Sequence, residues 1–194
     1  MKAIVLFAGL AILVIALSGC TIPTQELLNK PVEEYALALA DVDAGFKEHP
    51  DSKKYITLAD LSTNYPQLVT SGFQQGYIMT FYKGVSPSDS NLSGIDHSLY
   101  KFNTIEGATQ FFAIARDESE KIAQGDENAK VLSIPFKGDE IFAVQIEFPG
   151  GTFYPIVFRT KNITHVIGVV DTKNIFSEQT ISNYVDKIVE KTKK

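Results

Sequence analysis

The chain is short of the residue types on which several common classes of small protein depend. Its 194 residues include one cysteine, no tryptophan and three histidines, and the only arginines are Arg116 and Arg159. A single cysteine excludes a disulfide framework and the cysteine-rich zinc modules. Acidic residues outnumber basic ones by 23 to 18, which gives a net charge of −5. An acidic chain with so few arginines argues against nucleic acid as a partner.

One long apolar run is present, and it lies at the N-terminus. Residues 3–17 carry no charge and follow a single positive residue, Lys2. The run is shorter than the roughly 20 residues that a transmembrane helix needs. Its length and its position after a basic residue are typical of the hydrophobic region of a secretory signal.

This run ends in Leu17-Ser18-Gly19-Cys20, which resembles the lipobox of prokaryotic lipoprotein precursors. The resemblance implies that residues 1–19 are a cleaved signal peptide and that Cys20 is acylated on sulfur. The mature chain would have 175 residues and a net charge of −6, because only Lys2 is lost from the charged set. The alternative is an uncleaved signal anchor with an incidental cysteine. The lipoprotein interpretation predicts a lipid anchor in the cell membrane, with the domain facing away from the cytoplasm.

The rest of the chain is predicted to form a short tether followed by one domain. Residues 20–34 contain two prolines among mixed polar residues and are expected to form the acylated cysteine and its tether. Residues 35–194 are expected to form a single domain. Its 13 phenylalanines and 8 tyrosines supply enough apolar surface for a core.

Two segments have the apolar spacing of amphipathic helices. Residues 104–124 follow a helix-capping residue, Asn103 or Thr104, and their apolar stripe extends to Ile122. Residues 177–193 carry a second apolar stripe and end the chain. A short helix is expected within residues 58–70, and residues 35–40 suit either a strand or the end of a helix.

Six segments are rich in strand-forming residues. Short links between them require antiparallel pairing. Residues 163–170 are apolar on both faces, which predicts a central strand. The fold class is therefore α+β, a twisted antiparallel sheet with both long helices packed on it. The expected strands are residues 76–83, 95–102, 130–134, 140–148, 153–160 and 163–170.

This pattern resembles the PsbP/Mog1-like fold of small LpqN-type lipoproteins. The features that carry the resemblance are the helix after Thr104, the Gly138-Asp139-Glu140 segment, and the strands that follow it past Arg159 and Asn162. The resemblance implies a non-enzymatic accessory or binding domain at a membrane. It carries over no catalytic residues.

Few residues have the spacing of a catalytic or metal site. His49, His97 and His165 are expected to be structural; the alternative is that His97 and His165 meet across the sheet and bind a metal. Asp41-x-Asp43-x-Gly45 begins like a calcium loop but lacks the later ligands, so a simple turn is expected. No metal ligand and no cofactor-binding residue is predicted.

Asp139 and Glu140 are the adjacent carboxylates that acid–base chemistry would use. Neighbouring residues on a strand point to opposite faces, so we expect them not to converge. One of them is expected to pair with Arg159. Asn91 and Asn162 each begin an Asn-x-Ser/Thr sequence and are the candidate glycosylation sites in a glycosylating host.

These observations predict a lipid-anchored, extracytoplasmic binding or accessory domain at the cell envelope, with no catalytic residues. The aromatic residues of the strands suit a core, and they suit equally a groove for a small apolar ligand or an envelope protein partner. Two alternatives stay open. One is a structural envelope protein that acts through protein–protein contacts, and the other is an envelope enzyme whose site is assembled from scattered loops.

Overall fold

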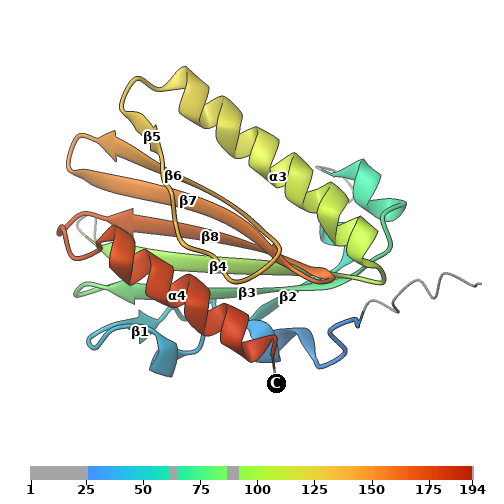
Figure 1. Ribbon diagram of the computed structural model, residues 1–194. Coiled ribbons are helices and arrows are strands. Elements are labelled where there is room, and N and C mark those ends of the chain that lie inside the picture. Colours follow the sequence, from blue (N-terminus) through green and yellow to red (C-terminus); the bar gives the residue numbers. More distant parts are fainter. Residues whose placement is uncertain (1–25, 62–64, 87–91, 194) are drawn as a thin grey trace, which may run out of the picture.

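An antiparallel sheet of eight strands forms the central layer, with a long helix on each face (Figure 1). The computed structural model describes residues 26–61, 65–86 and 92–193. Seven strands follow the order β1-β3-β4-β8-β7-β6-β5, and β2 pairs with β3. The strands are β1 (Lys47–Glu48), β2 (Lys54–Ile56), β3 (Phe73–Lys83), β4 (Ser93–Phe102), β5 (Ala129–Val131), β6 (Glu140–Phe148), β7 (Gly151–Thr160) and β8 (Ile163–Asp171).

Strand β8 lies between β4 and β7, which confirms the prediction of a central strand. Its core-facing side chains Ile163, His165, Ile167 and Val169 are all at most 1% exposed. Strands β6, β7 and β8 form an antiparallel meander, as the short links between them require. The α+β class is therefore correct, and all six predicted strands are present, β6 with the predicted bounds and the other five with shifted ends.

Helix α3 (Ile105–Gly125) covers one face of the sheet. Thr104, and not Asn103, caps it, because the Thr104 side chain accepts a hydrogen bond from the Gly107 amide at 3.0 Å. Phe112 and Ala115 pack against the sheet residue Val157. The predicted stripe is wrong at Ile122, which is 51% exposed.

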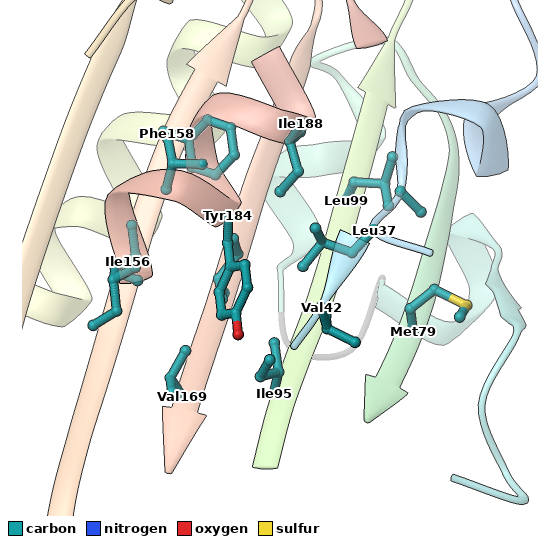
Figure 2. Close-up of a cluster of buried hydrophobic side chains, with 14 of the residues drawn as sticks. Leu37, Val42, Met79, Ile95, Leu99, Ile156, Phe158, Val169, Tyr184 and Ile188 are labelled. Carbon is teal, nitrogen blue, oxygen red and sulfur yellow. The ribbon is translucent and has the colours of Figure 1, made fainter. Parts of the chain in front are cut away.

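Helix α4 (Glu178–Lys191) covers the other face, and the larger hydrophobic core lies beneath it. Ser177 caps the helix by accepting a hydrogen bond from the Thr180 amide. Figure 2 shows side chains of this core, from α4, from strands β3, β4, β7 and β8 and from the N-terminal segment: Leu37, Val42, Met79, Ile95, Leu99, Ile156, Phe158, Val169, Tyr184 and Ile188.

The N-terminal segment belongs to the domain, and the predicted tether is therefore too long. Leu28 and Val32 are 6% and 1% exposed, and both join the core under α4. The segment continues as two 3-10 helices, η1 (Val32–Tyr35) and η2 (Leu39–Asp41). Residues 35–40, predicted as a strand or a helix end, thus comprise the end of η1, a non-helical link at 36–38 and the start of η2. The domain begins by Leu28, not at Tyr35.

Short elements also fill the region between this segment and β3. The expected helix at residues 58–70 is two pieces, α2 (Leu58–Leu61) and η3 (Pro66–Val69). Strands β1 and β2 were not predicted. They are two and three residues long, which is too short for any side-chain periodicity to show in the sequence.

The Asp41-x-Asp43-x-Gly45 segment is a turn, as expected. Asp41 accepts a hydrogen bond from the Ala38 amide at 2.7 Å, and Asp43 accepts one from the Tyr184 hydroxyl at 2.9 Å. Gly45 has a φ of +90°, a conformation that favours glycine. Within the described residues, no helix has the length and apolarity needed to cross a bilayer.

Candidate functional site

The two strand histidines meet in the core, on the neighbouring strands β4 and β8. His97 Nε2 lies 3.2 Å from His165 Nδ1, and both side chains are completely buried. His97 Nδ1 receives the Leu37 amide hydrogen at 3.1 Å, and His165 Nε2 lies 3.1 Å from the Thr160 hydroxyl. The ring of His165 also stacks on Phe158, with centroids 4.5 Å apart and planes 8° from parallel.

The Leu37 contact sets the direction of the whole chain of hydrogen bonds. A backbone amide only donates, so His97 Nδ1 accepts and its hydrogen sits on Nε2. That hydrogen is donated to His165 Nδ1, and His165 Nε2 then donates to Thr160. Both accepting nitrogens are occupied, so neither ring has a lone pair left for a metal ion. The histidines meet as the metal hypothesis required, but the contacts support the structural role.

Burial also keeps both rings neutral. Removal from water lowers the pKa of His97 from 6.5 to about 3, with a smaller effect from the Lys191 charge. The pKa of His165 is lowered well below 6.5, first by burial and then by His97. Among the described residues, no cluster of three or more histidine, cysteine or carboxylate side chains could hold a metal ion.

The Arg159 site differs from its prediction in one respect. Arg159 Nε lies 2.8 Å from Glu140 and Nη1 lies 3.1 Å from Asp139, so both carboxylates converge on one guanidinium. The alternation argument fails because β6 begins at Glu140, and Asp139 lies before the strand. Arg159 is 9% exposed, and it also donates to the Lys161 carbonyl at 2.9 Å. The group is an ion-pair network that closes the β7–β8 hairpin.

Asn162 is not available for glycosylation, so that prediction is wrong. Its side chain is 2% exposed. Its Oδ1 accepts the Leu28 amide at 2.7 Å, and its Nδ2 donates to the carbonyls of Phe102 at 2.8 Å and Leu28 at 3.4 Å. In the tight turn that precedes β8, the neighbouring residue Lys161 adopts a positive φ of +53°. Asn91, the other candidate, lies outside the described residues.

A wide hollow of about 520 Å³ lies where the chain enters the domain, lined in part by lysines. Those lysines are neutralised by nearby carboxylates. Lys137 lies 3.7 Å from Asp186, and Lys161 lies 3.1 Å from Glu26. Lys193 pairs with Glu190 in the same way. The hollow therefore presents no uncompensated charge to a ligand.

A smaller groove of about 280 Å³ lies on the α3 side of the sheet and is the better candidate site. Two rows of cross-strand neighbours form its floor. In one row the His49 amide bonds to the Thr80 carbonyl, and Thr80 pairs with Asp96. In the other row Tyr82 pairs with Gly94, which pairs with Val170. The described lining residues are His49, Thr80, Phe81, Tyr82, Leu92, Gly94, Asp96, Phe148, Val170 and Thr172.

This groove lies beyond the part of the face that α3 covers. Helix α3 packs near Val157 and Val166, whereas Tyr82 and Val170 further along remain partly exposed. Sequence reasoning treated the strand aromatics, to which Tyr82 belongs, as one set and did not find Asp96. The alternating pattern of β4 was the available signal, because it places Asp96 on the face opposite Ile95 and His97.

Comparison with known proteins identifies the fold but not a family. No family model matches the chain, and no curated protein matches it. Among solved structures, the extracellular domain of PknH from Mycobacterium tuberculosis is similar, with a TM-score of 0.55 and 12% sequence identity. The match covers 86% of this chain and 99% of that one. The protein therefore has an α+β fold that also occurs in an extracellular domain.

The buried histidines make stability depend on pH. The unfolded chain binds a proton at each histidine below about pH 6.5, and the folded chain does not, so stability falls as the pH falls from 6.5 toward 3. Each histidine should cost about 2 kcal/mol between pH 7.5 and pH 5. Urea unfolding at the two pH values measures this loss. His97→Gln should reduce it, and equal stability at both pH values would contradict the assignment of both buried rings as neutral and hydrogen-bonded.

The two arginines offer a matched comparison of ion-pair strength. Arg159→Ala should lower the free energy of unfolding by about 1–3 kcal/mol, because a buried guanidinium and its three partners are lost. The two carboxylates are 41% and 39% exposed and can turn to water, which limits the loss. Arg116→Ala should cost under about 1 kcal/mol, since Arg116 is 42% exposed. Chemical denaturation compares the variants, and equal losses would show that burial of Arg159 has no energetic role.

Proposed function

We propose that the protein is a lipid-anchored, extracytoplasmic domain at the cell envelope that acts by binding and not by catalysis. The lipobox-like Leu17-Ser18-Gly19-Cys20 segment supports the anchor. The similarity to an extracellular domain supports the location of the fold outside the cytoplasm. The likeness to PsbP/Mog1-type lipoproteins belongs to the same proposal, and the α+β architecture is compatible with it.

The position of Leu28 limits the length of the tether that an anchor at Cys20 would have. Leu28 is buried and bonded through its backbone to Asn162. It follows Cys20 by eight residues, which span at most about 28 Å even when fully extended. An acylated Cys20 would thus hold the folded domain close to the bilayer surface. Two acyl chains are needed for stable anchoring, because one chain gives only marginal binding.

The groove on the α3 side supports binding as the activity. It is a concave site whose floor is made of rigid strands and whose lining mixes aromatic and polar side chains. The buried histidines are unsuited to act as bases on a ligand, because both are inaccessible and already hydrogen-bonded. A structural role through protein–protein contacts is the second candidate, and the exposed Phe148 at the groove favours it.

Lipidation is tested by labelling the chain in its host with radioactive palmitate. The full chain should incorporate the label, and Cys20→Ser should incorporate none, because the acyl group is attached through sulfur. Thr21→Ser, a change at the neighbouring position, should label like the unchanged chain. Equal labelling of the Cys20→Ser variant, or an unlabelled parent chain, would contradict the anchor.

A further inference from the structure

We propose that the groove on the α3 side binds a small organic cation, an ammonium or guanidinium group on an apolar body. This inference rests on the proposed binding function and names the chemical class of its ligand. It is carried by three features of the groove: a carboxylate without a partner among the described residues, aromatic side chains in the same lining, and a floor position without a side chain at Gly94.

The charge of the groove comes from Asp96. Asp96 is exposed, and its carboxylate makes no hydrogen bond or ion pair within the part of the chain that the structure describes. It is the one formally charged residue among the described lining residues. His49 Nδ1 accepts a hydrogen bond from the Asp51 amide at 3.1 Å, so the ring of His49 is held by its own loop and not by Asp96. An anion in the groove would face this carboxylate uncompensated, whereas a cation would pair with it.

Aromatic rings line the same groove as this carboxylate. Tyr82 is one cross-strand row away from Asp96, and its ring meets that of His49 edge to face with centroids 6.1 Å apart. Phe148 lines the groove and is 40% exposed. Aromatic faces attract cations and also cover the apolar part of a ligand. Asp96 and these rings together favour an amphipathic cation over a metal ion, which would require several oxygen ligands.

Because Gly94 has no side chain, it leaves space on the floor of the groove that the ligand would fill. A side chain at this position would begin 3.3 Å from the tip of Leu92 and would project into the groove. The backbone of Gly94 is extended within β4, so a larger residue is conformationally acceptable there. The volume of about 280 Å³ suits a small molecule. The acidic balance of the whole chain adds long-range attraction for cations.

The probe is radiolabelled 2-phenylethylamine, compared with its neutral analogue 2-phenylethanol and its anionic analogue phenylacetate. The full chain is placed in phosphatidylcholine nanodiscs, and binding is measured by equilibrium dialysis against empty nanodiscs, which corrects for partition into lipid. The amine should bind at least about fivefold more tightly than the alcohol. Phenylacetate should not bind detectably.

Two variants test the assignment. Asp96→Asn should weaken amine binding to the level of the alcohol, and Gly94→Val should abolish binding of both by filling the floor. Glu127→Gln removes an exposed carboxylate far from the groove along the sequence and should bind the amine like the parent chain. Equal binding of amine and alcohol, full binding by Asp96→Asn, or no binding of the amine would overturn the proposal. None of these three outcomes bears on palmitate labelling, so the lipid anchor is tested independently of the ligand.

Discussion

The central place of β8, between β4 and β7, is the constraint on which the rest of the structure depends. Its side chains on the α4 side are at most 1% exposed beneath α4 and the N-terminal segment, whereas α3 covers only part of its other face, where Val166 and Val170 remain partly exposed. His165 lies on this strand in the core. Because it is buried, it must be neutral and hydrogen-bonded, which ties β8 to His97 and Thr160.

Hydrogen bonds and buried apolar side chains together hold the N-terminal segment to the sheet. Asn162 bonds the backbone of Leu28, and His97 accepts the amide of Leu37. Between these two points Val32 and Tyr35 enter the core under α4. A membrane anchor at Cys20 would therefore connect to the folded domain itself and not to a long flexible leader. With such an anchor, this arrangement would limit how far the domain can move from the membrane surface.

Periodicity made the long elements predictable, because each repeats its pattern over many residues. The prediction of 163–170 as the central strand and the approximate bounds of α4 followed from apolar spacing, and those of α3 followed from apolar spacing together with a capping residue before the helix. The failures lie where tertiary contacts override local pattern. Asparagine is a residue type typical of turns, yet the side chain of Asn162 hydrogen-bonds to two backbone segments that are distant in the sequence. The position of Asp96 in a groove could not be predicted either, because no local sequence pattern shows where α3 stops covering the sheet.

The central claim is that a cleaved and acylated N-terminus carries a folded domain which begins by Leu28. Intact-mass spectrometry of the chain purified from its own host membranes tests this most directly. The account predicts the mass of residues 20–194 increased by a lipid group attached at Cys20. The unmodified mass of residues 1–194, or a cleaved chain without lipid, would contradict it.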